Sequence, residues 1–245
     1  MASIGRRMAA TTTTLPAPFA WAGDHVGIEL PHGVRALFTT RRGGVSRPPF
    51  DTLNLGRWTD DEPAAVEENR ARVLALCGAR RFAFGRQVHG ATVLRDGDGE
   101  EADGQVTAER GVAPMVLTAD CLAVALAAPG GAGMVHAGWR GLADGVLEAG
   151  VAALGAPGAA AAIGPCARGC CYEVGDEVRA ALGLEPTGGP ALVDLPGLAR
   201  ERLLAAGVEA VHDSGLCTMC GDPSLFFSHR RDGGRTGRQA GVAWR

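Results

Sequence analysis

The chain has 245 residues, 46% of them hydrophobic and 21% charged, with a formal net charge of −3. This composition is typical of a folded domain rather than a disordered chain, and the small net charge argues against a nucleic-acid or membrane-surface protein. All 24 basic residues are Arg, which excludes mechanisms that need a Schiff-base or phosphate-loop lysine.

The first 18 residues differ in character from the rest of the chain. They contain two arginines and a Thr run, but no apolar segment of the kind that a signal peptide needs. We therefore predict a disordered leader over 1–18 and a single catalytic domain over 19–245. No uncharged apolar run reaches the length of a membrane span.

Hydrophobic periodicity and Gly/Pro breaks define the expected elements of the domain. In chain order we predict a strand over 34–40, a Gly/Pro loop over 41–50, a helix over 61–78, a strand over 86–94 interrupted at Gly90, an acidic loop over 95–104, two buried strands or one bent strand over 113–130, a strand that passes into a helix near Gly141 over 133–154, a strand, a Cys/Gly loop and a helix start over 161–178, a helix over 192–208, and a strand, an Arg/Gly turn and a closing strand over 217–244. Interleaved strands and helices of this kind indicate an α/β (mixed α+β) layered domain.

Three apolar segments each carry a soft metal ligand beside a turn: His89, Cys121 and His136. Two imidazoles and one thiolate suit zinc, and a fourth position left open for water or substrate is typical of catalytic zinc sites. Asp120 lies beside Cys121 in an apolar run, where a carboxylate needs a partner or a function. It is our candidate for relaying protons.

Spacing alone does not settle this metal site, because the three residues are far apart and match no compact ligand motif. One alternative is a buried free cysteine with two histidines that serve the core. Another is a nucleophilic pair in which His136 activates Cys121.

The chain has seven cysteines, an odd number, which argues against a disulfide framework and favours a reducing cytoplasm. Cys217-x-x-Cys220 is the clearest pair. With Cys166, Cys170 and Cys171 it could form a structural zinc site, but the usual second C-x-x-C pair is absent. Ordinary reduced thiols in a loop are the favoured interpretation.

Several arginines could hold an anion. Arg41 and Arg42 precede Gly43-Gly44, whose N–H groups could cradle an anionic group, and Arg140 follows His136 by four residues. A phosphate would suit Arg41 and Arg140 if both reach the metal. Four more arginines cluster near the C-terminus: Arg230, Arg231, Arg235 and Arg238. A solvated, salt-bridged hairpin is the favoured interpretation for at least Arg231 and Arg235.

Taken together, the motifs resemble those of the laccase-domain or YfiH-type "polyphenol oxidase" family. They occur in order over residues 38–244 as TTRRGGVS, LNLG, ENR, QVHG, ADG, TADCLAV, HAGWRGL, IGPC, CYEVG, CT and FFSHRRDGGRTGRQAGVAW. HAGWRG together with TADC is the most specific combination. The match covers nearly the whole chain apart from the leader.

The resemblance implies a layered fold with mixed sheets flanked by helices and a Zn²⁺ site at His89, Cys121 and His136. It also implies purine nucleoside phosphorylase activity, with adenosine deaminase and methylthioadenosine phosphorylase activities. The substrates would be purine nucleosides and phosphate. Four residues in matching motifs are candidates for contacts with them: Arg41, Asn54, Gln87 and Arg140.

Three other functions compete with this one. A multicopper oxidase needs many histidines, often in His-x-His pairs, whereas this chain has six His and no such pair, so copper is only an alternative metal for the same site. A cysteine hydrolase or deamidase would use Cys121 as its nucleophile. A binding module would have a closed zinc site with four ligands. We expect no nucleic-acid or membrane partner, and a monomer or weak homodimer.

Overall fold

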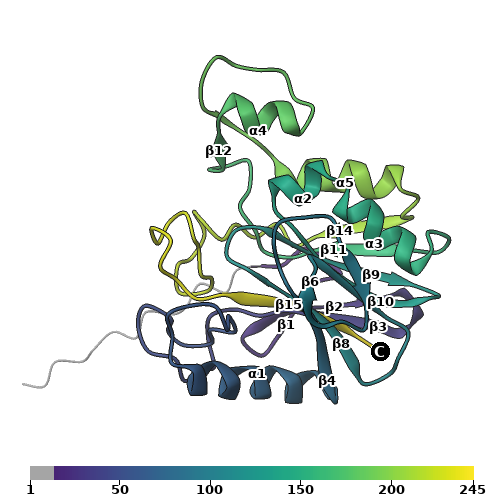
Figure 1. Ribbon diagram of the computed structural model, residues 1–245, viewed down its shortest axis with the longest axis vertical. Coiled ribbons are helices and arrows are strands. Elements are labelled where there is room, and N and C mark those ends of the chain that lie inside the picture. Colours follow the sequence, from purple (N-terminus) through teal and green to yellow (C-terminus); the bar gives the residue numbers. More distant parts are fainter. Residues whose placement is uncertain (1–13) are drawn as a thin grey trace, which may run out of the picture.

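The computed structural model describes residues 14–245, drawn in Figure 1 with colours along the chain. Most of the predicted leader lies outside the described residues. Its last five residues, 14–18, contain no helix or strand, and Leu15 packs against buried residues of the domain. A single domain over 19–245 remains a prediction.

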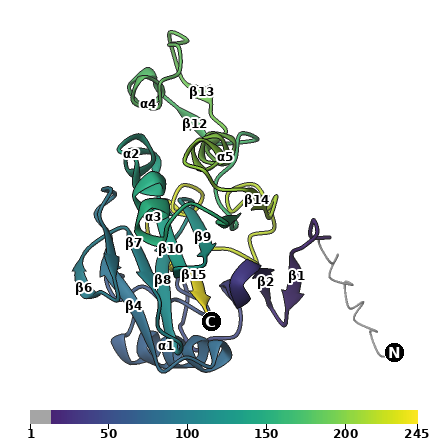
Figure 2. The same ribbon diagram turned by 90° about the vertical axis from the view of Figure 1, so that its right-hand side faces the viewer.

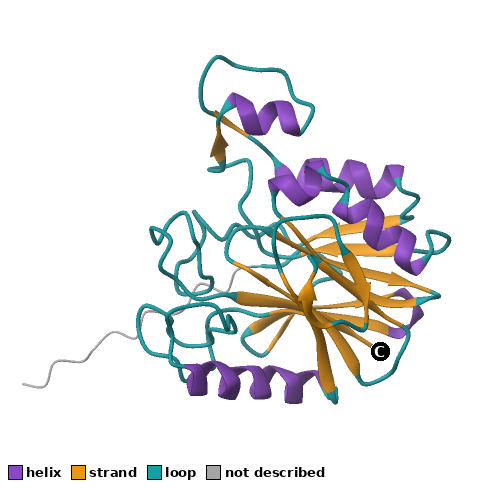
Figure 3. Ribbon diagram, viewed as in Figure 1, coloured by secondary structure: helices purple, strands orange, loops and turns teal. Residues whose placement is uncertain are grey.

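Two large mixed sheets and one short strand pair contain the described strands (Figure 3). The first sheet has the order β1 (Ala20–Ala22), β2 (His25–Leu30), β3 (Val34–Phe38), β15 (Gln239–Trp244), β8 (Val112–Thr118), β4 (Arg81–Arg86) and β6 (Asp98–Glu101). The second has the order β14 (Ala210–Asp213), β11 (Ala160–Ile163), β9 (Leu122–Ala128), β10 (Gly131–Ala137), β7 (Gly104–Thr107) and β5 (Val93–Arg95). The short pair is β12 (Glu173–Val174) and β13 (Ala191–Leu192).

Helices flank the two sheets (Figures 2 and 3). They are α1 (Pro63–Cys77), α2 (Trp139–Ala143), α3 (Val146–Leu154) and α5 (Leu195–Ala205), with a 3-10 turn at Pro31–Gly33. α4 (Asp176–Ala181) projects beyond α2 and α5 together with the short strand pair (Figure 1). Among the described helices, none has the length and apolar character that crossing a bilayer requires. The predicted mixed α/β fold with flanked sheets is confirmed.

The alternation of side chains along β9 shows how the layers pack. Leu122, Val124 and Leu126 lie in the core beneath α3 and α5, whereas Ala123 and Ala125 lie in the core between the two sheets. Successive side chains of a strand point to opposite faces, so both faces of β9 are buried. The alanines let the sheets approach closely.

Gly241 of β15 lies at one point of this close approach. A Cβ atom there would lie 2.8 Å from the Cβ atom of Ala123 and 2.8 Å from the sulfur of Met134, both in the second sheet. On its other face, the first sheet packs against α1 through Val73 and Cys77. The order of layers is therefore helix, sheet, sheet, helices.

Several predicted elements are confirmed, some with shorter bounds. The strand at 34–40 is β3, the helix at 61–78 is α1, and the helix at 192–208 is α5. Gly78 caps α1 with φ 63°, a conformation that glycine adopts without strain. The strand over 113–130 proves to be two strands, β8 and β9, which belong to different sheets.

Four predicted elements are wrong. Residues 87–92 form a loop rather than a strand, and the acidic segment contains strand β6. The helix predicted from Gly141 breaks into α2 and α3 at Gly145, where φ is 84°. No strand forms over 217–238; only the closing strand, β15, is confirmed.

Candidate metal centre

His136 is the most deeply buried of the three predicted ligands. It lies on β10 opposite Ala123 of β9, and its side chain is 3% exposed. Its Nδ1 atom lies 2.7 Å from a carboxylate oxygen of Asp103, which is fully buried. This contact fixes the ring and leaves Nε2 as the nitrogen for a metal, as in many carboxylate–histidine–metal arrangements.

The same carboxylate also holds His89. The backbone N–H groups of Val88, His89 and Gly90 donate to Asp103 over 3.1, 3.0 and 2.8 Å. His89 adopts a positive φ of 62°, which costs a non-glycine residue energy. The three hydrogen bonds offset that cost, and they explain why this apolar-looking segment is a loop rather than a strand.

Cys121 lies where the chain crosses from one sheet to the other. β8 ends at Thr118 in the first sheet and β9 begins at Leu122 in the second, so Cys121 stands at the junction. Asp120, beside it, has φ 97°. Its carboxylate accepts a hydrogen bond from the Thr218 hydroxyl at 2.7 Å and another from the Arg230 backbone N–H at 2.8 Å.

The three candidate ligands converge on one point. One side-chain ligand atom from each of His89, Cys121 and His136 lies within 4.8 Å of the others, and the Cys121 sulfur lies 3.9 Å from His89 Nε2. Gly138 makes room for them, because a Cβ atom there would lie 2.8 Å from the His89 ring and 3.3 Å from the Cys121 sulfur. The first glycine of the HAGWRG motif, Gly138, is therefore required because a side chain there would clash with the candidate ligands.

Anionic groups and histidines shift one another's pKa in this site: burial lowers the pKa of His136, but the charge of Cys121 and the contact with Asp103 raise it to about 9. Burial raises the pKa of the Cys121 thiol, but the charge of His136 and hydrogen bonds from both histidines outweigh it and lower the pKa to about 6. Burial also raises the pKa of Asp103, whereas hydrogen bonds from His136 and Gly90 hold it below its usual range. Thiolate and carboxylate therefore accompany the imidazoles. This donor set fits one zinc ion with an open position.

The three ligands line a cavity of about 390 Å³, within the range of small-molecule sites. Asp120, Gln87 and the segment 117–119 also line it. The remaining lining residues come from segments far apart in the sequence: Gly56, Trp58, Thr59, Tyr172, His229, Arg230 and Arg238. Figure 1 shows the blue loops before α1 and the yellow segment before β15 on the same side of the molecule.

The structure brings only one of the four candidate substrate-binding residues into the cavity lining. Gln87 lines it, while its amide exchanges hydrogen bonds of 2.7 and 2.8 Å with the backbone of Leu117. Arg41 lies outside the lining, where it donates to Asp51. Arg140 also lies outside it, exposed, with its guanidinium 4.1 Å from the ring centroid of Trp139.

Asn54 is fully buried and acts at one remove from the cavity. Its side-chain oxygen accepts the N–H groups of Gly56 and Arg238 at 3.0 and 2.8 Å, and its amide donates to Thr59 over 2.8 Å. These three partners line the cavity. Asn54 therefore braces two parts of the wall. Direct substrate contacts by these four residues remain predictions.

The salt-bridged hairpin favoured for the C-terminal arginines describes only part of that cluster. Arg231 pairs with Asp232, and Arg235 lies 4.0 Å from Asp60. Arg230 and Arg238, however, line the cavity. The sequence favoured salt bridges for Arg231 and Arg235, but it did not predict that the other two arginines reach the cavity.

Asp103, Trp58, Tyr172 and His229 were also missed as site residues. The ADG motif contained the only signal for Asp103, a carboxylate in an otherwise unremarkable Gly-flanked position. Tyr172 is partly buried, and this burial raises the pKa of its hydroxyl. Trp58 is 61% exposed and also lines the cavity. Both aromatic rings offer flat apolar surface beside the metal centre.

A two-sheet α/β fold with three possible metal ligands in an open cavity is the arrangement expected of a metal-site enzyme. The family model described as "Multi-copper polyphenol oxidoreductase laccase" matches residues 35–245. The chain belongs to this family, as the motifs predicted.

Relatives support the same assignment. A purine nucleoside phosphorylase of Pseudomonas aeruginosa is 44% identical over 231 residues, covering 87% of this chain and 94% of the relative. The Escherichia coli purine nucleoside phosphorylase YfiH is 39% identical, covering 87% and 95%. The solved structure of Bacillus licheniformis YfiH has a TM-score of 0.87 at 30% identity, covering 94% and 99%. That of YlmD from Geobacillus stearothermophilus has a TM-score of 0.84 at 33% identity, covering 92% and 97%.

Proposed function

We propose that the chain is a zinc-dependent purine nucleoside phosphorylase. It would convert inosine, guanosine or adenosine, with phosphate, to the free base and ribose 1-phosphate. The observation that carries the proposal is the convergence of His89, Cys121 and His136 in a cavity that also presents two arginines and two aromatic rings. The relatives named purine nucleoside phosphorylases support it.

Zinc is the proposed metal because the donor set offers two imidazoles, one thiolate and a carboxylate behind one imidazole. When bound, the ion would supply positive charge and a Lewis acid at the cavity floor. Asp103 would keep the His136 ring oriented, and its bonds to the loop 88–90 would hold His89 in place.

The cavity wall suggests how the substrates bind. Arg230 and Arg238 supply fixed positive charge for phosphate. Burial lowers the pKa of Arg238, while the nearby Cys121 and Asp120 raise it, so this guanidinium lies close to the metal centre. Trp58 and Tyr172 offer surfaces on which a purine can stack. Gln87, Arg41 and Arg140 stay in the proposal as further contacts, and Asn54 as the residue that positions Gly56, Thr59 and Arg238.

In the proposed reaction a phosphate oxygen forms a bond to the ribose C1′ while the bond from C1′ to the purine nitrogen breaks. The purine leaves with that electron pair and takes up one proton. Asp120 is the proposed donor or relay of this proton, since its carboxylate lines the cavity beside Cys121. Positive groups preorganised around developing anionic charge would lower the barrier.

The proposal includes two further activities of the same site. Attack of water at C6 of adenosine would release ammonia, and phosphorolysis of methylthioadenosine would release adenine. We also propose a reducing cytoplasm as the compartment, because all seven cysteines are free, and a monomer or weak homodimer as the working form.

The decisive experiment measures base release from inosine and adenosine with and without phosphate, on protein whose zinc and copper contents are known. We expect one zinc at this centre, phosphate-dependent release of hypoxanthine from inosine, and loss of both in His89→Ala. His212→Ala, in β14 outside the cavity lining, is the matched control. Base release that ignores phosphate would refute phosphorolysis.

A cysteine hydrolase with Cys121 as nucleophile is the second candidate. Burial raises the pKa of Cys121, but His136, the predicted activator, lowers it, and His89 Nε2 also lies 3.9 Å from the Cys121 sulfur. This candidate predicts activity that survives chelators and is abolished by alkylation of metal-free protein. Multicopper oxidation fits less well: in the described part of the chain only two residue groups are arranged to hold a metal, and only one contains histidine. Stoichiometric copper with oxygen uptake would reinstate it.

A further inference from the structure

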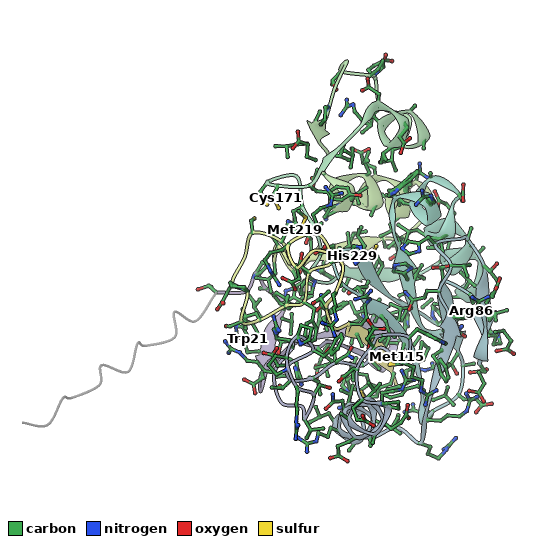
Figure 4. All side chains as sticks on the ribbon, turned by 60° about the vertical axis from the view of Figure 1, so that its left-hand side comes forward. Trp21, Arg86, Met115, Cys171, Met219 and His229 are labelled. Carbon is green, nitrogen blue, oxygen red and sulfur yellow. The ribbon has the colours of Figure 1, made fainter. Side chains whose placement is uncertain are left out.

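Four cysteines meet on the surface, outside the cavity lining described above. Cys170 and Cys171 lie in the loop after β11, and Cys217 and Cys220 lie in the loop after β14. β11 and β14 are parallel neighbours, so both loops leave the same edge of the second sheet. Figure 4 shows Cys171 and Met219 beside each other, with sulfur atoms gathered there.

The backbone itself joins these loops. Cys166 and Cys217 form an isolated parallel bridge, in which the N–H of Thr218 donates to the carbonyl of Cys166 over 3.0 Å. Nearby, Arg168 and Asp213 form a two-pronged ion pair with distances of 2.8 Å. The two loops are therefore held in register before any bond involves the four sulfur atoms.

The distances between the sulfurs are closer to those of a four-thiolate zinc site than to those of disulfides. They are 3.1 Å for Cys170–Cys220, 3.4 Å for Cys171–Cys217 and 3.7 Å for Cys170–Cys171, and all four atoms lie within 4.8 Å of one another. Sulfurs at the corners of a tetrahedron around zinc, with bonds of about 2.3 Å, are about 3.8 Å apart. Disulfide sulfurs are about 2.05 Å apart.

We propose that Cys170, Cys171, Cys217 and Cys220 form a second metal site, a four-thiolate zinc site with a structural role. Four soft thiolates select zinc over hard cations. Binding would release the thiol protons and form four sulfur–zinc bonds without any change in oxidation state. All four positions would be filled by the protein, which is typical of structural rather than catalytic zinc.

The site would stabilise two loops that contribute to the cavity of the candidate metal centre. Tyr172, which lines the cavity, directly follows Cys171. Thr218, which directly follows Cys217, donates its hydroxyl to Asp120. A single ion would thus tie together the loop that carries Tyr172 and the loop that orients Asp120. The proposed function does not depend on this second ion, nor does the second ion depend on it.

The test counts metal ions per chain. Protein purified with reductant in zinc-containing medium is measured by elemental analysis, as wild type and with the exposed ligand changed in Cys220→Ser. We expect two zinc ions in wild type, one in Cys220→Ser and one in His89→Ala, whose lesion lies in the other centre. Cys77→Ala, in α1 and outside the cluster, should keep two.

A second measurement uses only chains with an intact cysteine cluster. In His89→Ala, one Co²⁺ ion should bind and give the intense sulfur-to-cobalt absorption of several thiolates, and zinc should raise the melting temperature. Two outcomes would overturn the proposal. The first is that His89→Ala binds no metal. The second is that mass spectrometry of freshly prepared protein shows disulfides among the four cysteines, each as the loss of two hydrogens.

Discussion

The carboxylate of Asp103 serves both histidines of the metal centre at once. It accepts three successive N–H groups of the loop 88–90 and faces His136 Nδ1 at 2.7 Å. A carboxylate is only an acceptor, so it suits four donors, whereas an amide would present its own N–H groups to some of them. Asp103 is thus a positioning residue that acts through the ligands.

Asp103→Asn should therefore weaken metal binding about 10- to 100-fold, the range found when such supporting partners are removed. The measurement is the zinc dissociation constant of this centre, by competition with a chelator. Asp144→Asn makes the same change of charge on an exposed residue and should leave the constant unchanged. Equal affinities in the two variants would refute the role assigned to Asp103.

The structural and catalytic roles of the Asp120 carboxylate can be tested separately. An asparagine can accept from the Arg230 N–H and donate to Thr218, so Asp120→Asn should keep both hydrogen bonds. We expect an unchanged zinc content and melting temperature, with kcat reduced about 100-fold or more by loss of proton transfer. An unchanged kcat would leave Asp120 with only its structural contacts.

At this scale the sequence named the three candidate ligands that the structure brings together, but not their surroundings. His89, Cys121 and His136 rest on family motifs, since their own spacing left a free thiol and buried histidines open. Asp103, Arg230 and Arg238 also lie in the quoted motifs, but nothing local shows that they belong to the site, because the chain brings them there only by folding. Whether each residue acts on the substrate as predicted is a question for kinetics.

Among the elements, α1 holds the cavity wall through one buried side chain. The Asn69 side-chain oxygen accepts the Val45 N–H at 2.9 Å, and its amide donates to Ser46 and to the carbonyls of Thr52 and Asn54. Asn69 is fully buried. The loop 45–54 therefore depends on a helix that starts more than eight residues later.

Asn69→Ala should lower the free energy of unfolding by about 2 kcal/mol or more, because it strands several buried backbone groups. Denaturant unfolding gives this value. Glu68→Ala, an adjacent substitution that removes only an exposed pair with Arg72, should change it by less than about 1 kcal/mol. Similar losses in both variants would mean that helix propensity, rather than the buried amide, matters.

Elements with a clear local signal were predicted well, and those that depend on distant partners were not. α1 has a glycine stop, and β8 and β9 are long apolar runs. The segment 87–90 also looked like a strand, but Asp103 captures its N–H groups and Gln87 pairs with Leu117 from 30 residues away. No local pattern contains either partner.

For the whole molecule, the contact between the two sheets is the critical surface. Gly241→Ala would place a methyl group 2.8 Å from Ala123 and Met134, in a core with no room for it. We expect the free energy of unfolding to fall by about 1–3 kcal/mol through overpacking. Gly189→Ala is the control, because a Cβ atom there meets nothing within 4 Å. Equal stability of the two variants would show that the two sheets can move apart to accommodate the methyl group.

The position of β15 also bears on how the chain folds while it is being made. This strand lies between β3 and β8, yet about 200 residues separate β3 from it in the sequence. While a ribosome is still translating the middle of the chain, β3 and β8 lack the strand that joins them, and their open edges can pair with other chains. Newly synthesised protein should therefore need protection by chaperones until Gln239–Trp244 has left the exit tunnel.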